Sequence, residues 1–122
     1  MAVAEHLTIG RHGEEAAARY LLELGYDIRE RNVRFRRDEI DIVAYDRRRG
    51  MMVFVEVKAR SSVSALYPIR TAVDRRKKKC LRRAIGRWIV AKRYDGPGRI
   101  DIVTMSGDKV VEHVLDVGSD FF

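Results

Sequence analysis

Two short stretches decide the fold: Glu39-Ile40-Asp41-Ile42-Val43 and Val53-Phe54-Val55-Glu56-Val57-Lys58. Both are rich in Val, Ile and Phe, which favour β-strands. Alternation with a period of two puts Glu39 and Asp41 on one face of the first strand and Ile40 and Ile42 on the other. The polar residues 46–50 separate the two stretches. The sequence therefore predicts a β-hairpin with strands at residues 39–45 and 51–58.

The charged residues of this hairpin are candidates for chemistry. Glu56 and Lys58 share one face of the second strand, so Asp41 and Glu56 converge at one edge if the strands pair. Two neighbouring carboxylates repel each other unless a cation lies between them, and Mg²⁺ prefers such oxygen ligands. A lysine beside them can orient water or offset phosphate charge, which indicates phosphodiester hydrolysis. The alternative is a solvated Glu–Lys ion pair that contributes little.

Helical and extended segments surround the hairpin. Apolar and small residues at helical spacing predict a helix over residues 8–24, with Thr8 as its cap and Gly25 ending it. A second helix is expected at residues 73–94, before the breaker Asp95-Gly96-Pro97-Gly98. Three further strands are expected at residues 26–37, 100–105 and 110–115, the first with an irregularity near Asn32.

The expected order is α-β-β-β-α-β-β, which is typical of an α/β fold with a central mixed sheet flanked by helices. The strand at residues 100–105 follows a helix, so it can pair parallel to an earlier strand through a crossover. The chain has 122 residues, and domains commonly contain ~100–150. We therefore expect one domain over residues 1–122.

Composition excludes several classes of protein. The chain is 46% hydrophobic, too apolar for a wholly disordered chain. Its one cysteine, Cys80, excludes an intrachain disulfide framework and a cysteine-based zinc site. No apolar run approaches the ~20 residues of a membrane span, and residues 1–10 lack the pattern of a secretory signal. We expect a cytoplasmic protein with no membrane association.

The net charge of +7 is concentrated in the second helical region. Eleven basic residues and one acid lie in residues 70–93, a local charge of +10, so the rest of the chain carries −3. This indicates a polyanionic partner, and nucleic acid is the expectation, although a solvated helix face is the alternative. The candidate phosphate-binding residues are Arg47, Arg48, Arg49, Arg60, Arg75, Arg76, Lys78, Lys79, Arg82 and Arg83.

Two charged residues lie beside apolar helix faces. Glu14 borders the apolar face of the first helix, where it either reaches the sheet edge or is a first-turn acid stabilised by the helix dipole. Lys77 lies four residues before Leu81, so we expect it to point toward the sheet and an acidic site. Arg76, Lys79 and Arg83 are expected to face elsewhere.

The sequence resembles the YraN-like family of small bacterial proteins, assigned to the PD-(D/E)XK nuclease superfamily. Seven segments in order, over about residues 9–117, carry the resemblance. They are Gly13-Glu14 with Ala17 and Tyr20-Leu21, Gly25-Tyr26, Arg31-Asn32-Val33-Arg34, Glu39-Ile40-Asp41-Ile42-Val43, Val53-Phe54-Val55-Glu56-Val57-Lys58-Ala59-Arg60, Ala72-Val73, and Lys77 with Leu81 and Ala84.

The resemblance implies a restriction-endonuclease-like core and a role for each matching residue. Asp41, Glu56 and the carbonyl of Val57 would bind the metal, Mg²⁺ or Mn²⁺, and Lys58 would be the catalytic lysine. Glu14 would be the acid of the first helix and Lys77 the polar residue of the second. The similar archaeal Holliday-junction resolvases act as dimers, which leaves a homodimer open here.

The sequence departs from the family pattern at two places. Asp38 stands where the family usually has glycine, and an extra acid there is expected to alter metal affinity. Ala65-Leu66-Tyr67 replaces the usual Phe-Gly of the loop after the lysine.

The sequence therefore predicts a Mg²⁺-dependent nuclease acting on structured or branched DNA. Two alternatives stay open. One is a nucleic-acid-binding protein that keeps the nuclease fold without catalysis, and the other is a partner of a DNA-repair or membrane-associated complex.

Overall fold

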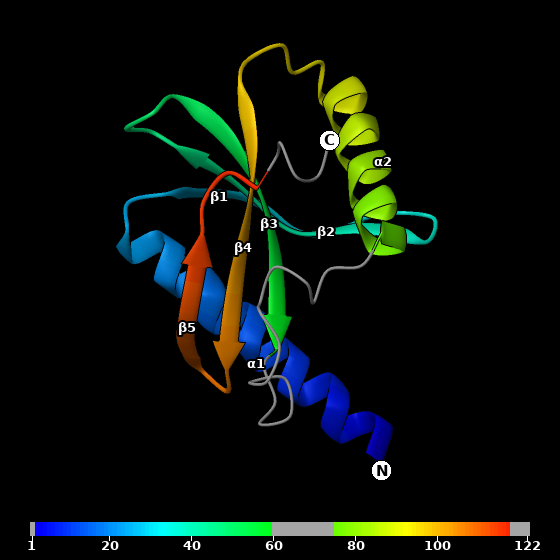
Figure 1. Cartoon of the computed structure of the whole chain (residues 1–122), viewed down its shortest axis with the longest axis vertical. Helices are drawn as coiled ribbons and strands as arrows, with labels where there is room; N and C mark the ends of the chain where they lie inside the picture. Colours follow the sequence, from blue (N-terminus) through cyan, green and yellow to red (C-terminus); the bar gives the residue numbers. More distant parts are fainter. Residues whose placement is uncertain (1, 60–74, 118–122) are drawn as a thin grey trace.

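A five-stranded mixed sheet lies between two helices in the computed structural model, which describes residues 2–59 and 75–117 (Figure 1). The expected order of elements and the α/β, restriction-endonuclease-like fold class are confirmed. The elements are α1 (Ala2–Glu23), β1 (Asp27–Phe35), β2 (Asp38–Asp46), β3 (Met51–Ala59), α2 (Arg75–Lys92), β4 (Gly98–Ser106) and β5 (Lys109–Val114).

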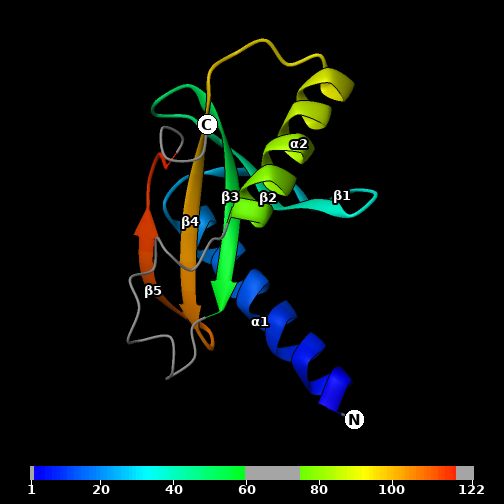
Figure 2. The ribbon, with the colours of Figure 1, turned by 45° about the vertical axis from the view of Figure 1, so that its right-hand side comes forward.

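The strands lie in sequence order, β1-β2-β3-β4-β5. All neighbouring pairs are antiparallel except β3 and β4, which are parallel and have α2 between them in the sequence. The expected crossover is thus confirmed. In both views α1 lies on one side of the sheet and α2 on the other (Figures 1 and 2).

Two element boundaries differ from the prediction. α1 begins at Ala2, so Thr8 lies inside the helix and does not cap it, because the preceding Ala, Glu and Leu residues favour helix and include no breaker. β1 ends at Phe35, and Arg36 makes the turn into β2 with a φ of 59°. The expected irregularity near Asn32 is confirmed by its φ of 53°.

Gly25 ends α1 as the sequence predicts. It has a φ of 93°, a conformation that glycine adopts without steric cost. Its N–H donates to the carbonyl of Leu22 at 2.9 Å, and the N–H of Tyr26 donates to that of Leu21 at 3.0 Å. These bonds satisfy carbonyls that the helix end would leave unpaired.

The hydrophobic core is divided by the sheet. Val53 and Val55 of β3 pack with Leu21 and other residues of α1. Phe54, on the opposite face of β3, packs with Trp88 and other residues of α2. Since helices cover both faces, polar side chains near the middle of the sheet are buried unless they lie where a helix ends.

A buried ionic network lies at the start of β4. Arg99 is 7% exposed, and its guanidinium contacts the carboxylates of Asp46 at 2.8 Å and Asp101 at 2.9 Å. Arg99 also donates to the hydroxyl of Tyr26 at 2.7 Å, and His113 contacts Asp101 at 2.8 Å. The network joins the end of β2 to β4 and β5, and its charges compensate one another.

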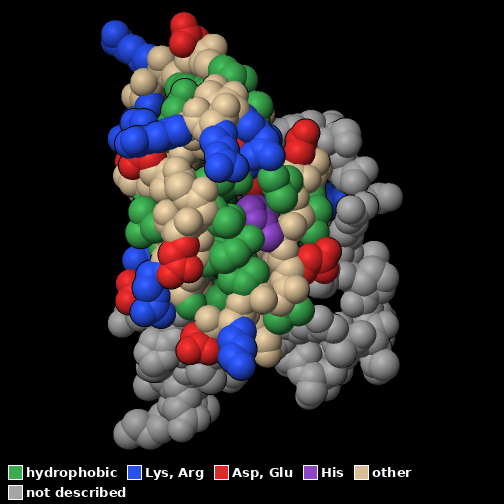
Figure 3. Space-filling view, turned by 90° about the vertical axis from the view of Figure 1, so that its left-hand side faces the viewer, with side chains coloured by type: hydrophobic (Ala, Val, Ile, Leu, Met, Phe, Trp, Pro, Cys, Tyr) green, Lys and Arg blue, Asp and Glu red, His purple; other side chains and the backbone are tan. Residues whose placement is uncertain are grey.

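Hydrophobic side chains gather around a histidine on the face shown in Figure 3. Large hydrophobic residues that are exposed include Val111 of β5 and Leu22 of α1. The homodimer stays a prediction, and the apolar pair Phe121-Phe122, which could take part in a protein contact, lies outside the described residues. Within residues 2–59 and 75–117, no helix has the length and apolar character needed to cross a membrane.

Candidate active site

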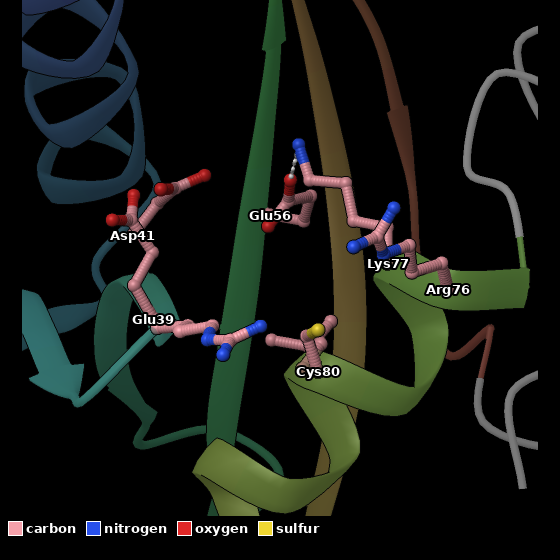
Figure 4. Close-up of a pocket in the computed structure, with 8 residues that line it drawn as sticks. Glu39, Asp41, Glu56, Arg76, Lys77 and Cys80 are labelled. Carbon is pink, nitrogen blue, oxygen red and sulfur yellow. Dashed lines mark ion pairs between the residues drawn. The ribbon is translucent and has the colours of Figure 1, made fainter.

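A cavity of about 360 Å³ opens beside the first turns of α2 (Figure 4). Its walls come from the β1–β2 turn, β2, β3 and α2, so segments far apart in the sequence contribute to it. The lining residues are Arg37, Glu39, Asp41, Glu56, Arg76, Lys77, Cys80 and Leu81. The cavity therefore contains three of the five predicted catalytic residues: Asp41, Glu56 and Lys77.

Asp41 lies where β2 separates from β3. The regular pairing of these strands ends at Ile42 and Val55. One residue further, the Asp41 carboxylate accepts a hydrogen bond of 2.8 Å from the N–H of Val57. The side chain of Asp41 thus takes the place of a backbone partner for β3 and lies between the strands.

The prediction that Ile40 and Ile42 lie on the same face of β2 is wrong. Ile42 packs on the α1 side of the sheet, as expected for its position, but Ile40 packs in the cluster of α2. The strand departs from regular alternation around Asp41. Glu39 and Asp41 nevertheless lie close together, as the sequence predicts.

Three carboxylates form a candidate metal centre. One oxygen from each of Glu14, Glu39 and Asp41 lies within 4.8 Å of the others. Glu14 comes from the middle of α1, so the first-turn explanation for this acid is wrong. Three oxygen donors at this separation fit a hard divalent cation such as Mg²⁺.

The electrostatics of these acids are consistent with a cation site. Burial, together with the nearby charge of Glu56, raises the pKa of Asp41 to about 8. Burial, together with Glu39, also raises the pKa of Glu14. A bound cation would favour the charged carboxylates and so oppose the effects of burial and of mutual repulsion on both pKa values.

Glu56 is paired with a lysine. The carboxylate, on a residue that is 3% exposed, lies 2.7 Å from the ammonium of Lys77 (Figure 4). The expectation that Lys77 points toward the sheet is confirmed. The predicted metal ligands Asp41 and Glu56 line the same cavity. Asp41 belongs to the group of three carboxylates, whereas Glu56 lies outside that group and pairs with Lys77.

Lys58 lies two residues after Glu56 on β3 and is half-buried. Burial, together with the neighbouring Lys77, lowers the pKa of Lys58. Burial lowers the pKa of Lys77, but the hydrogen bond and the charge of Glu56, with smaller contributions from Lys58 and Asp41, together raise it. The pKa values of the two lysines are thus shifted in opposite directions. Val57 contributes its N–H to Asp41, and a metal-binding role for its carbonyl stays a prediction.

The candidate phosphate-binding residues fall into separate places. Arg76, Lys79 and Arg82 are exposed on α2, while Lys78 is half-buried. Contrary to expectation, Arg76 lines the cavity. Arg60 lies outside the described residues, as does the loop 65–67, and the side chain of Arg75 is likewise not described.

Arg83 was expected to face away from the sheet, and this is wrong. Its guanidinium binds the carboxylate of Asp38 through two hydrogen bonds of 3.0 Å. This contact lowers the pKa of Asp38. Asp38, which stands where the family usually has glycine, thus binds Arg83 of α2. It does not belong to the group of carboxylates formed by Glu14, Glu39 and Asp41.

Arg47, Arg48 and Arg49 are exposed in the β2–β3 turn, at the opposite end of the hairpin from Asp41. Five residues separate Asp41 from Asp46, which is ~17 Å at the rise of a strand. The triple-arginine turn is therefore not beside the candidate metal centre. Arg47 contacts Asp27 at 3.6 Å, and Arg49 contacts Asp46 at 3.0 Å.

Two charged residues of the cavity, Glu39 and Arg37, have no role predicted from the sequence. Glu39 had a usable signal, because it lies two positions before Asp41 and shares its face of the strand. Arg37 had none, since its place depends on the turn at Arg36, which lacks the usual glycine or asparagine.

The five-stranded mixed sheet with a helix on each face is a restriction-endonuclease-like α/β fold. The chain belongs to the family described as "Uncharacterised protein family UPF0102", the YraN family, whose family model matches residues 13–105. This family is a member of the PD-(D/E)XK nuclease superfamily.

Three relatives illustrate the similarity. A UPF0102 protein of Chlorobium phaeobacteroides is 46% identical over 76 residues, which are 62% of this chain and 59% of that protein. One from Chlorobium limicola is 33% identical over 118 residues, covering 89% of this chain and 90% of the relative. One from Bacteroides thetaiotaomicron is 42% identical over 106 residues, covering 87% of this chain and 85% of the relative.

Proposed function

We propose that this protein is a Mg²⁺-dependent nuclease that hydrolyses phosphodiester bonds in structured or branched DNA. The observation that carries the proposal is the meeting of two buried acids, Asp41 and Glu56, in one cavity with Lys77. Buried carboxylates without a counter-charge are costly. A site that keeps several of them together is suited to a cation and a phosphate.

The carboxylates of Glu14, Glu39 and Asp41 would hold the ion. Bound Mg²⁺, or Mn²⁺ in its place, supplies charge neutralisation at the phosphate and lowers the pKa of water. Hydrolysis joins a water oxygen to phosphorus, breaks a P–O ester bond, and requires one proton to leave the water and one to reach the departing oxygen. The lowered pKa of Lys58 favours its neutral amine over that of an ordinary lysine, and the neutral amine is the form that can accept the proton from the water.

Contact with nucleic acid is proposed along α2. Its exposed arginines and lysines suit phosphates, which give affinity without reading sequence. Several basic residues of α2 contact acids of the sheet: Lys77 contacts Glu56, Arg83 and Arg87 contact Asp38, and Lys92 contacts Glu30. We expect the exposed side chains of Arg76 and Lys79 to contact phosphates near the first cavity.

The test combines cleavage with binding. Wild type, Asp41→Asn and Lys58→Ala are incubated with junction, flap and single-stranded DNA in Mg²⁺ and in Mn²⁺. Both variants should lose at least ~100-fold in cleavage rate, since general base catalysis alone contributes ~10²–10⁴-fold. Binding, measured in EDTA, should stay within a few-fold of wild type. Lys109→Ala is the matched control, because Lys109 is an exposed lysine on β5.

Equal cleavage by wild type and both variants on all three substrates would contradict the proposal. Loss of cleavage in Lys109→Ala would also contradict it, because no chemistry is assigned to that lysine. Calorimetric titration with Mg²⁺ provides a separate readout, in which Asp41→Asn should bind the ion at least tenfold more weakly.

A second candidate is a nucleic-acid-binding protein without catalysis. The ion pair between Lys77 and Glu56 favours it, since a lysine already neutralises one of the two central acids. This reading predicts salt-sensitive DNA binding, no cleavage with either cation, and no heat of Mg²⁺ binding.

A further inference from the structure

A second cavity of about 360 Å³ lies at the other end of α2. It is formed by the start of β1, the start of β3, the last turns of α2 and the segment that follows this helix. The lining residues are Arg29, Glu30, Met52, Trp88, Lys92 and Tyr94. Basic and aromatic side chains thus meet here, at a distance from the candidate metal centre.

The aromatic wall of this cavity is held in place from two sides. The rings of Trp88 and Tyr94 lie 6.0 Å apart at 59°, and Phe54 meets Trp88 edge-on at 5.4 Å. The indole N–H donates to Glu30, whose carboxylate also contacts Lys92 at 2.9 Å. Because Trp88 is only 4% exposed, the ring face open to a flat ligand is that of Tyr94. A ring held in place in this way loses little conformational entropy when a ligand packs against it.

The charges around the cavity suit a phosphate. The side chains of Arg29 and Lys92 are about half exposed, at 48% and 50%, although each contacts an acid, Arg29 with Asp27 at 3.0 Å and Lys92 with Glu30 at 2.9 Å. The neighbouring β2–β3 turn carries Arg47, Arg48 and Arg49, and it ends at Met51, next to Met52 of the cavity. The turn that lies far from Asp41 is therefore close to this second cavity.

We propose that this cavity binds one unpaired nucleotide of the DNA substrate. The base packs against the half-buried ring of Tyr94, next to the buried indole of Trp88, and the flanking phosphates contact Arg29 and Lys92. Base–aromatic stacking requires an exposed base face, which paired and stacked bases in a duplex do not offer. The volume is near the lower end of ligand cavities, ~300–1,000 Å³, which suits a single nucleotide and not a base pair. This inference rests on the proposed function and names the substrate feature.

The spacing of the two cavities sets a length. Met52 and Glu56 lie four residues apart on β3, or ~13 Å. Lys77 and Lys92 lie fifteen residues apart on α2, or ~22 Å. At ~3.4 Å per nucleotide along a strand of duplex, the unpaired nucleotide lies about four to six nucleotides from the phosphate that is cut.

The test uses the fluorescence of Trp88, the one tryptophan of the chain. The full-length protein is titrated in EDTA, so that nothing is cut. The probes are a duplex with one unpaired thymine, the same duplex with an abasic site at that position, and the fully paired duplex. We expect quenching with the unpaired base, and binding at least tenfold tighter than with the abasic probe.

Variants separate the cavity from general attraction to DNA. Arg29→Gln and Tyr94→Leu should each reduce the preference for the unpaired base at least fivefold, measured by anisotropy of labelled DNA. Lys109→Gln is the matched control and should keep the preference. Circular dichroism of each variant checks that it is folded.

Equal affinity for the unpaired and abasic probes would overturn the inference, as would a preference that both variants retain. These outcomes are distinct from failure of the proposed function. A protein that cuts DNA but does not distinguish the probes lacks this nucleotide site. A protein that distinguishes the probes but cuts nothing has the site without the catalysis.

Discussion

Replacing Asp41 by asparagine should stabilise the metal-free protein while weakening its hold on a cation. In the folded protein the pKa of Asp41 is about 8, against 3.8 for an ordinary aspartate in the unfolded chain. At pH 7 the carboxyl must therefore keep a proton that the unfolded chain would release. At pH 7 the solution lies roughly 3 pH units above the pKa of the unfolded chain, and keeping the proton there costs on the order of 4 kcal/mol of folding free energy.

The sign of the pH dependence follows from the raised pKa. A carboxyl with a raised pKa contributes stability that is fully present below its unfolded value and is lost as pH rises toward its folded value. Wild type should lose stability relative to Asp41→Asn between about pH 4 and pH 8. Asparagine keeps an oxygen that can accept from the N–H of Val57, so the contact to β3 survives.

Urea unfolding of both proteins at pH 4, 6 and 8 measures this effect. The variant should gain little at pH 4 and a few kcal/mol at pH 8, and Mg²⁺ should raise the stability of wild type alone. Asp108→Asn is the control, because Asp108 is exposed in the turn before β5. A gain that does not change with pH, or equal stabilisation of both proteins by Mg²⁺, would refute the reasoning.

Two further predictions concern other charged contacts. Arg99→Met should lower the free energy of unfolding by about 3–5 kcal/mol, because Asp46 and Asp101 stay buried but lose the guanidinium that they share. Urea unfolding at pH 7 measures the change, and a loss below about 1 kcal/mol would contradict the prediction. Asp38→Gly should free the guanidinium of Arg83 for phosphate, so that the slope of log affinity for DNA against log salt steepens by about one. An unchanged slope in fluorescence anisotropy would count against that role for Arg83.

The sequence was sufficient for most of the fold because local patterns and tertiary packing agree. The hairpin of β2 and β3 is rich in Val, Ile and Phe and has a polar turn, and Gly25 ends α1 with the conformation that glycine favours. The turn between β1 and β2 was missed. Arg36 has a positive φ there, a conformation that pairing of the two strands imposes and that the residue type does not signal.

The candidate site was predictable as far as single elements could show it. The shared faces of Glu39 with Asp41, and of Glu56 with Lys58, follow from strand periodicity. The partners of Glu56 and Asp38 do not, because they depend on how α2 lies across the sheet. Helical spacing placed Lys77 toward the sheet but could not show that a long arginine such as Arg83 would reach back to β2.

α2 is one continuous helix that runs from the first cavity to the second, and because a helix is rigid along its axis it fixes the distance between them. A ligand that reaches both ends must match that length, because the helix cannot shorten to meet it. Straight duplex DNA resists local bending over so few steps, whereas a strand with a gap, a bulge or a junction bends with little cost. Selection among substrates would then arise from the mechanics of the nucleic acid, with no base pair being read.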